Sequence, residues 1–317
     1  MKALITRLTA DNQREGVLVT DWPDPGKPVG NQIRTKTVYS GVTNGTERNF
    51  LVRGNYAPKD TSLPCSMGYQ IIARVIETGP DVKQWKVDQL LYMATPHAEY
   101  TVVPEDAKLI EVPPEIDPKH AALFGMASVA MNTCRTIDVR MGERVLIVGL
   151  GCIGQIASQI ANSMGAKVTT CDIDQNRIDL ARKIGAAEEV YNVSGENWNK
   201  HILDDSYDVV IDVAGVPDME DQFIHAIRIK GRIILMGGRF KVNYTFGEGQ
   251  NKELTIKQTG SFSGDDLANL SRMVQRSAVK IGPLIRDVVT LDDAGRIYEK
   301  LRDRPHELLG TVFSWQE

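Results

Sequence analysis

Between residues 144 and 262 the chain alternates short apolar runs with amphipathic segments of helical period. The expected strands are "RVLIVG" (144–149), "KVTTCD" (167–172), "EEVYN" (188–192), "DVVIDVA" (208–214), "RIILMG" (232–237) and "LTIKQTGSF" (254–262). Strands that alternate with helices pair in parallel, because each helix carries the chain back to the same edge of the sheet. The pattern therefore predicts an α/β domain with a doubly wound, six-stranded parallel sheet.

The first part of the chain has a different pattern. Short runs rich in β-branched residues, such as "QIRTKTVYSGV" and "IIARVIETG", are separated by turn residues, which predicts an irregular and mostly antiparallel β domain. The stretch "VPPEIDP" then ends this pattern. We expect a β domain over residues 1–117, the parallel-sheet domain over residues 118–263, and a C-terminal segment over residues 264–317 that returns to the first domain.

The turn after the first expected strand reads G-L-G-C-I-G and opens a helix. Gly149 suits a tight turn, Gly151 leaves room for a pyrophosphate to approach the backbone, and Gly154 lets the helix pack closely on the strand. The helix N-terminus, with Cys152 and Ile153, offers free N–H groups to phosphate. A lone G-x-G-x-x-G is a weak signal, but a strand before it and an acid after the next strand make it a Rossmann dinucleotide-binding fingerprint.

The acid is Asp172, which ends the second strand and is followed by Ile173. Its carboxylate can accept hydrogen bonds from both hydroxyls of the adenosine ribose and would repel a 2′-phosphate, so NAD is preferred over NADP. Arg177 leaves alternatives open, because it could reach a 2′-phosphate, stack on adenine or lie solvated on its helix. A Rossmann-like sheet that binds no dinucleotide is the blander alternative.

With this domain order, the stretches "GERVLIVGLGCIGQIASQIANSMGAKV", "DVVIDVAG" and "GRIILMGG" resemble the medium-chain dehydrogenase/reductases. The segments "SGVTNGTE", "HAEYTVVPEDAKLIEVP" and "AALFGMASVAMNT" are most similar to the polyol (sorbitol-type) and bacteriochlorophyllide-type branches. The resemblance implies a GroES-like β domain beside the Rossmann domain. It also implies nicotinamide contacts after the later strands at Val213, Ala214, Met236, Gly237 and Ser261, of which Val213 and Met236 could alternatively be plain core residues.

The resemblance also shows where this chain departs from its zinc-binding relatives. Their catalytic zinc cysteine corresponds to Asn44, their histidine to Tyr69, the neighbouring glutamate to Gln70, and the glutamate of the polyol enzymes to Gly125. The lobe that holds a second, structural zinc has no counterpart near "VDQLLYMATP". Amide and phenol oxygens are weak ligands for zinc, so we expect no metal.

Without a metal, side chains must handle the substrate proton. We expect Tyr69 to contact the reacting oxygen, although it could simply fill the space left by the zinc. His97 could be the base or a packing residue. Thr46 takes the place of the family's proton-relaying hydroxyl or is a turn threonine, and Glu47 is an orienting group or a helix-start residue. The amides of Asn44 and Gln70 could orient the substrate but cannot act as bases.

The resemblance implies a zinc-independent, NAD-dependent oxidoreductase that interconverts a secondary alcohol and a ketone. A sugar, cyclitol or other polyhydroxylated substrate and a homodimer follow by analogy with the polyol enzymes. The alternatives are an NADPH-dependent enoyl or quinone reductase, against which Asp172 argues, and a non-catalytic NAD-binding sensor, which the glycine fingerprint does not exclude.

Charge and composition narrow the partners. A net charge of −4 without a basic run gives no footprint for nucleic acid, and no apolar stretch is long enough to span a bilayer. The N-terminal residues lack the apolar centre of a signal peptide, and the four cysteines are widely spaced without a C-x-x-C pair. We therefore expect reduced thiols and a cytoplasmic location.

Overall fold

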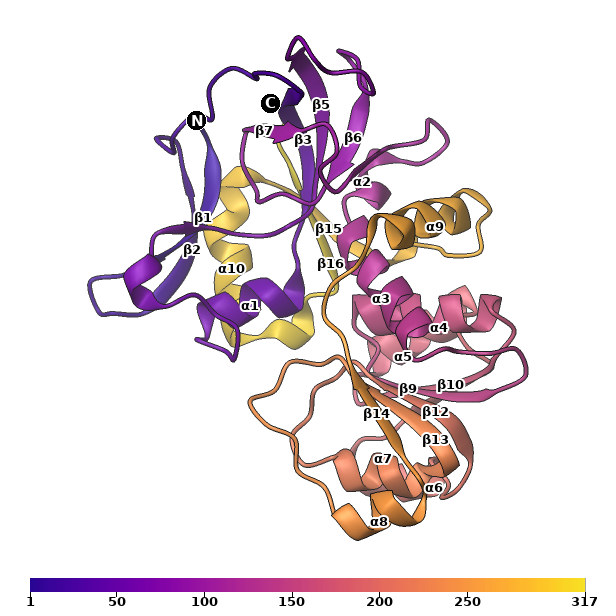
Figure 1. The fold of residues 1–317 in the computed structure, drawn as a ribbon. Helices are drawn as coiled ribbons and strands as arrows, with labels where there is room; N and C mark the ends of the chain where they lie inside the picture. Colours follow the sequence, from indigo (N-terminus) through magenta and orange to yellow (C-terminus); the bar gives the residue numbers. More distant parts are fainter. Residues whose placement is uncertain (317) are drawn as a thin grey trace. The chain divides into compact units, whose positions relative to one another are not determined.

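A computed structural model describes residues 1–316 and separates the chain into two compact units (Figure 1). The first unit contains Met1–Gly125 and the chain from Leu284 onward, and the second contains Met126–Pro283. These divisions differ from the expected boundaries at 117/118 and 263/264. The helix α9 (Gly264–Gln275) thus lies in the second unit, where Arg135 Nη1 pairs with Asp266 Oδ1 at 2.5 Å.

The second unit contains the alternation of strands and helices that the sequence predicts. Its elements up to β11 are α3 (Phe124–Thr136), which begins at the end of the first unit, β9 (Arg144–Val148), α4 (Cys152–Ser163), β10 (Lys167–Asp172), α5 (Gln175–Ile184) and β11 (Glu189–Asn192). The later elements are η2 (Gly195–Asn197), α6 (Trp198–His201), β12 (Tyr207–Asp212), α7 (Glu220–Ala226), β13 (Ile227–Leu235), α8 (Phe246–Asn251), β14 (Thr255–Gln258) and α9. The six strands lie in the order β11-β10-β9-β12-β13-β14 and all pair in parallel, which confirms the predicted doubly wound sheet.

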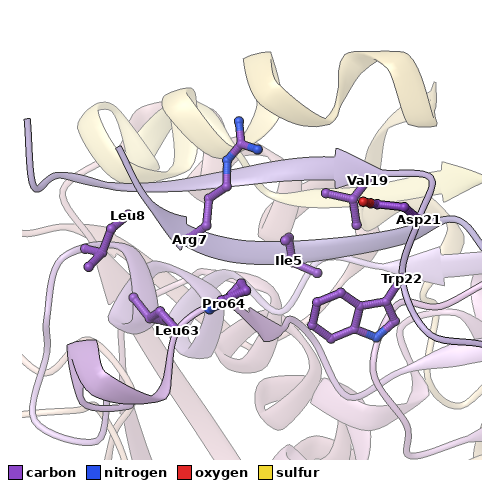
Figure 2. Close-up of a pocket in the computed structure, with 8 residues that line it drawn as sticks. All are labelled: Ile5, Arg7, Leu8, Val19, Asp21, Trp22, Leu63 and Pro64. Carbon is purple, nitrogen blue, oxygen red and sulfur yellow. The ribbon is translucent and has the colours of Figure 1, made fainter. Parts of the chain in front are cut away.

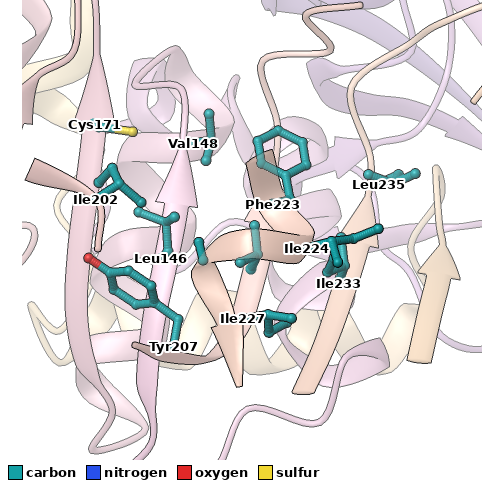
Figure 3. Packing of buried hydrophobic residues seen from close by; sticks show 12 residues of the cluster. Leu146, Val148, Cys171, Ile202, Tyr207, Phe223, Ile224, Ile227, Ile233 and Leu235 are labelled. Atoms are coloured by element: carbon teal, nitrogen blue, oxygen red, sulfur yellow. The ribbon is translucent and has the colours of Figure 1, made fainter. Parts of the chain in front are cut away.

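Helices cover both faces of this sheet. In Figure 1, α4 and α5 lie on one face and α6, α7 and α8 on the other. On the second face Phe223 and Ile224 of α7 pack against Leu146, Ile233 and other strand residues (Figure 3). Strands buried on both faces need apolar side chains at nearly every position, which explains continuous runs such as "RVLIV".

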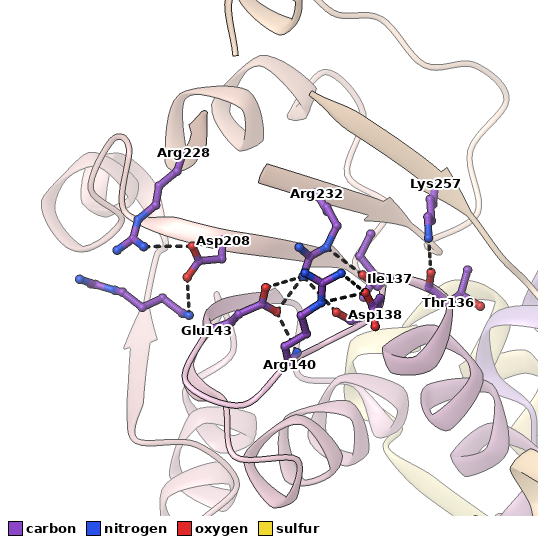
Figure 4. A network of polar contacts seen from close by, with 10 residues as sticks. Thr136, Ile137, Asp138, Arg140, Glu143, Asp208, Arg228, Arg232 and Lys257 are labelled. Carbon is purple, nitrogen blue, oxygen red and sulfur yellow. Dashed lines mark hydrogen bonds and ion pairs between the residues drawn. The ribbon is translucent and has the colours of Figure 1, made fainter. Parts of the chain in front are cut away.

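At the amino ends of these strands, charged side chains connect neighbouring loops (Figure 4). Arg232 donates to the carbonyl oxygens of Ile137 and Asp138, both at 3.0 Å, and pairs with the Glu143 carboxylate at 2.7 Å. Asp208 accepts from the Arg144 N–H at 2.8 Å. This edge is held together by contacts within the unit itself.

The first unit contains two sheets. Its strands and helices up to β6 are β1 (Ala3–Leu8), β2 (Arg14–Val19), β3 (Gln32–Gly41), α1 (Asn44–Leu51), η1 (Asp60–Ser62), β4 (Cys65–Ser66), β5 (Ile71–Thr78) and β6 (Leu90–Met93). The others are β7 (Tyr100–Pro104), β8 (Leu109–Glu111), α2 (Pro118–Ala121), η3 (Gly282–Leu284) at the boundary, β15 (Ile285–Thr290), η4 (Leu291–Asp293), α10 (Ala294–Asp303), η5 (Pro305–Glu307) and β16 (Gly310–Ser314).

The smaller sheet has the order β2-β1-β4 and the larger one β15-β16-β3-β5-β6-β8, with β7 also paired to β3. Every pairing is antiparallel except β15 with β16, as expected for an irregular, mostly antiparallel domain. The C-terminal segment returns to this unit because β16 pairs with β3. Among residues 1–316, no helix has both the length and the apolar character that crossing a membrane requires.

Candidate functional site

The glycine turn between β9 and α4 is built as the fingerprint requires. Gly149 has a positive φ of 101°, which a side chain would strain. A Cβ on Gly154 would lie 1.8 Å from the Gly149 carbonyl oxygen, so only glycine fits there. A Cβ on Gly151, the N-cap of α4, would meet no atom within 4 Å. The fold itself therefore does not require glycine at position 151. The missing side chain leaves an open cradle over the backbone, which a pyrophosphate would occupy.

Asp172 is buried at the end of β10 and is connected to the glycine turn. Its carboxylate accepts hydrogen bonds from the N–H groups of Leu150 at 2.6 Å, Ile173 at 2.7 Å and Asp174 at 2.9 Å. The remaining lone pair can still accept from a ribose hydroxyl. Arg177 Nη1 lies 3.7 Å from the same carboxylate, so the guanidinium partly offsets the charge that would repel a 2′-phosphate.

The other candidate cofactor residues lie at this same carboxyl edge of the sheet. Val213 and Ala214 follow β12. A Cβ on Gly149 would lie 3.0 Å from Ala214 Cβ, and a Cβ on Gly154 would lie 3.1 Å from Val213 Cγ2. Beyond β13, Met236 and Gly237 each donate a backbone N–H to the Asp212 carbonyl, at 3.0 and 3.1 Å.

Three further candidates lie beside these. Ser261 follows β14 and accepts at its carbonyl from Asn132 of α3 at 2.7 Å. Ile173 is 70% exposed next to Asp172, which leaves an apolar surface there. Cys152 begins α4. Burial raises the pKa of its thiol to about 12, so the side chain packs as a neutral group. The next residue, Ile153, is half-buried.

A buried charge cluster at this edge was missed in the sequence. Arg239, which follows β13, pairs with Asp212 at the end of β12 and with Glu220 Oε1 of α7 at 2.7 Å. Asp212 also accepts from the N–H groups of Ala214 and Gly215, both at 3.1 Å. The cluster holds the loops that carry Val213 and Met236. The one sequence feature that points to this cluster is the acid that ends the apolar strand "DVVID". An acid at that place is equally typical of an ordinary strand end.

The first unit holds the candidate catalytic residues, which come from three separate segments. Asn44, Thr46 and Glu47 lie at the start of α1, Tyr69 and Gln70 precede β5, and His97 precedes β7. The side chain of Thr46 lies close to the phenol of Tyr69 and also to that of Tyr56, a tyrosine with no motif of its own in the sequence. The pKa of Tyr69 is raised above its ordinary value near 10 by burial and by the nearby Glu47 carboxylate, so this phenol stays protonated.

Glu47 and His97 form a buried pair. Their side chains are 1% and 0% exposed, and His97 Nε2 lies 3.2 Å from Glu47 Oε1. Glu47 Oε1 also accepts from the Thr43 N–H at 2.5 Å and the Thr43 hydroxyl at 2.7 Å. Burial opposes ionisation of Glu47, but the charge and hydrogen bond of His97 together with Thr43 leave its pKa lowered. His97 thus lies beneath the surface that a substrate could touch, in a position that suits it to hold Glu47.

The residues at the family's zinc positions do not fit the metal. Gln70 is fully buried and donates to the Gly41 carbonyl at 3.1 Å. A side chain at Gly125 would meet Tyr92 Oη at 2.7 Å and Tyr69 Cε2 at 2.9 Å, so these rings fill the space of the polyol enzymes' glutamate. Within residues 1–316, no group of three or more His, Cys, Asp or Glu side chains has an arrangement that could hold a metal. Neutral amides and a protonated phenol are poor zinc donors.

Asn44 keeps one unused acceptor. Its amide nitrogen donates to the Leu308 carbonyl at 3.4 Å, while its Oδ1 is buried without a partner in the described part of the chain. A hydroxyl-bearing substrate could satisfy that oxygen. A separate hollow of about 480 Å³ lies on the β2-β1-β4 sheet (Figure 2), but none of the candidate residues lines it.

Known proteins resemble this chain in sequence. Residues 152–277 match a family model described as zinc-binding dehydrogenase. The matched residues lie in the second unit and exclude positions 44, 69, 70 and 125, at which the relatives' zinc ligands are expected. The probable D-xylulose reductase A of Arthroderma otae is 25% identical over 332 residues, which cover 91% of this chain and 92% of that protein.

Solved structures resemble the chain over its whole length. A structure described as a short chain alcohol dehydrogenase from Escherichia coli CFT073, complexed with NADH, has a TM-score of 0.82 at 16% identity and covers 99% of both chains. A structure described as a zinc-binding dehydrogenase from Sinorhizobium meliloti 1021, bound to NADP, has a TM-score of 0.82 at 19% identity with the same coverage. At these identities the likeness establishes the fold, and the two structures hold different nicotinamide cofactors.

Proposed function

Because the chain belongs to the medium-chain dehydrogenase/reductase superfamily, we propose that it is a zinc-independent, NAD-dependent oxidoreductase that interconverts a secondary alcohol and a ketone. One observation carries the proposal. The glycine turn and Asp172 have the form of a dinucleotide site, while the family's zinc positions hold Asn44, Tyr69, Gln70 and Gly125. The chain has kept the means to bind a hydride carrier and replaced the donors for a metal.

Residues of the first unit would take over the handling of charge at the substrate oxygen. A protonated Tyr69 can donate a hydrogen bond to a ketone oxygen or to the oxygen of an alcohol losing its proton, as oxyanion donors do in other enzymes. The free Oδ1 of Asn44 can accept from a second hydroxyl and so orient a polyol. Glu47 and His97 act indirectly, by holding the segments that carry Thr46 and Tyr69. NAD, when bound, supplies the acceptor for the hydride.

The preference for NAD rests on Asp172, and its test is a comparison of the two cofactors. We expect NAD to raise the melting temperature of the protein more than NADP at equal concentration. Asp172→Ser should weaken NAD binding by about tenfold or more, because it removes a charged hydrogen-bond acceptor, and should improve NADP binding beside Arg177. A larger thermal shift with NADP in the unchanged protein would support the NADPH-dependent reductase instead.

The reaction itself is tested with a panel of polyols, cyclitols and glycosides, by measuring NADH formation. We expect turnover without added metal, zinc well below one equivalent per chain by metal analysis, and no loss of rate after treatment with a chelator. Tyr69→Phe should lower kcat by about a hundredfold, since a positioned donor contributes on that order. One tightly held zinc per chain would refute zinc independence, and an absence of turnover with every substrate would favour the sensor.

We further propose a cytoplasmic homodimer. β14 is an edge strand of the parallel sheet, and the exposed Phe246 lines the same hollow as Ile256 of that strand. An unpaired edge beside an apolar surface is typical of a subunit interface. Light scattering should give twice the chain mass, and Phe246→Asp should shift it toward the mass of one chain.

A further inference from the structure

We propose that Arg239 is a positioning residue for the nicotinamide half of the bound dinucleotide. It joins the loops after β12 and β13 into one rigid wall, and it acts through that wall without touching the cofactor. This inference rests on the proposed function and adds to it a buried cluster, Arg239 with Asp212 and Glu220, that lies outside the glycine fingerprint.

The order of the strands indicates which loops the nicotinamide would meet. A dinucleotide crosses an open α/β sheet at the point where the strand order reverses. Here β10 lies on one side of β9 and β12 on the other. Asp172 marks the adenosine half at the end of β10, and Gly151 marks the pyrophosphate in the turn after β9. The nicotinamide half is therefore expected at the ends of β12 and β13.

The loops at these two strand ends touch each other through their backbones. A Cβ on Gly237 would overlap the Gly215 nitrogen, and a Cβ on Gly215, whose φ is +68°, would lie 3.0 Å from the Gly237 carbonyl carbon. The loop after β12 also borders the glycine turn, because a Cβ on Gly149 would lie 3.0 Å from Ala214 Cβ. A displacement of one loop is therefore passed to the other, since no side chain between them can absorb it.

Arg239 connects this pair of loops to the sheet and to α7. Its Nε donates to the Gly237 carbonyl at 3.2 Å, and its Nη1 pairs with Glu220 Oε1 of α7 at 2.7 Å. Its Nη2 pairs with the carboxylate of Asp212 at the end of β12. That carboxylate in turn accepts from the N–H groups of the second and third residues after it, both at 3.1 Å. One guanidinium thus fixes both loops.

The burial of the cluster makes Arg239 a positioning residue and not a cofactor ligand. Its side chain is 8% exposed, and the side chains of Asp212 and Glu220 are 0% and 5% exposed. Charge-assisted hydrogen bonds between buried groups hold a fixed geometry, because little water is at hand to replace a lost partner. Lysine cannot take over this role, since its ammonium group lacks the planar fork that reaches three acceptors.

The test compares Arg239→Lys with Arg232→Lys, a matched control. Arg232 lies within β13 and also bonds two carbonyl oxygens and one carboxylate, but at the amino ends of the strands. The measured quantities are the dissociation constants of NADH and of ADP-ribose, which lacks the nicotinamide. Arg239→Lys should weaken NADH binding about tenfold and leave ADP-ribose binding within about twofold, because only the nicotinamide wall moves. Arg232→Lys should leave both constants in place.

Two further readouts support the comparison. At saturating NAD and alcohol, Arg239→Lys should lower kcat about a hundredfold, because the nicotinamide is no longer held at the distance that hydride transfer requires. Glu220→Gln removes one charge of the cluster and leaves Asp212 paired with Arg239, so it should shift the ratio of the two dissociation constants in the same direction but by less. This second variant serves as the test if thermal unfolding shows that Arg239→Lys does not fold.

The outcomes separate this proposal from the proposed function. Equal losses of NADH and ADP-ribose affinity in Arg239→Lys and Glu220→Gln would overturn it, because the cluster would then support the whole domain. Unchanged affinities in both variants, or the same shift of the ratio in Arg232→Lys, would overturn it as well. If the unchanged protein oxidises no alcohol, the proposed function fails, whereas a selective loss of NADH affinity in Arg239→Lys would still support the positioning role.

Discussion

The glycine turn of the second unit and the polar cluster of the first differ in how the chain assembles them. The turn and its acid come from one continuous stretch, residues 144–172, and use backbone N–H groups and missing side chains. The polar cluster comes from α1, the segment before β5, the segment before β7 and α10, and it depends on side chains that are buried against one another. A site made from backbone can be recognised in sequence, whereas a site made from tertiary contacts cannot.

The largest expected effect comes from substitutions in the glycine turn, the site that is built from backbone. Gly154→Ala should destabilise the second unit by about 3 kcal/mol, because its Cβ would overlap the Gly149 carbonyl, and should abolish dinucleotide binding. Gly151→Ala is the matched control. Its Cβ meets nothing, so stability should stay within about 0.5 kcal/mol, while NAD affinity should fall at least about tenfold because the methyl group enters the pyrophosphate cradle.

Urea unfolding and calorimetric titration with NAD measure the two quantities separately. Equal NAD affinity in Gly151→Ala and in the unchanged protein would show that the pyrophosphate does not lie over Gly151. The turn would then have a structural role only.

The next effect concerns the buried pair of the first unit. Glu47→Gln should cost about 3 kcal/mol of unfolding free energy at pH 7, because it breaks a buried pair and leaves His97 without its carboxylate. Glu115→Gln changes an exposed glutamate that forms no ion pair within residues 1–316, and it should cost less than about 0.5 kcal/mol.

The pH dependence of stability follows from the lowered pKa of Glu47. Because its folded pKa lies below the ordinary value of 4.5, the unfolded chain takes up the proton first as the pH falls. The stabilisation is complete above pH 4.5 and is lost as the pH falls through the folded pKa. Glu47→Gln should therefore flatten the acid limb of a plot of unfolding free energy against pH. An unchanged slope would mean that Glu47 is not ionised in the folded protein.

The smallest expected effect tests whether Gln70 stabilises the fold or contacts the substrate. Gln70→Met keeps the side-chain volume and removes the hydrogen bond to the Gly41 carbonyl, so we expect a loss of about 1 kcal/mol in unfolding free energy and little change in kcat. Chemical unfolding and steady-state kinetics measure both. A hundredfold fall in kcat at intact stability would instead place Gln70 in contact with the substrate.

Much of the fold was predictable from the sequence, for physical reasons. Strands buried on both faces need continuous apolar runs, so all six strands of the parallel sheet were found, although β12 and β13 begin earlier than expected. The expected boundaries at 117/118 and 263/264 differ from the division into compact units at 125/126 and 283/284. The Arg135–Asp266 pair, which joins α3 to α9 across distant segments, has no local signature in the sequence.

The site divides in the same way. Gly149, Gly151, Gly154 and Asp172 have local signatures, whereas the partners of His97 and Arg239 do not. The sequence leaves His97 open as either the base or a packing residue, and nothing in the sequence indicates that it is buried against Glu47. Tyr56 was not selected because a surface tyrosine in a turn has no pattern of its own.

The turn before β9 is a suitable place to attach a label to the protein. Met141 is 82% exposed at the amino end of that strand, within the loops that Arg232 and Glu143 hold in place. The glycine turn follows the opposite end of the same five-residue strand, roughly 17 Å away. A fluorophore or a surface tether attached through Met141→Cys would therefore report on this domain, or immobilise it, without obstructing the dinucleotide.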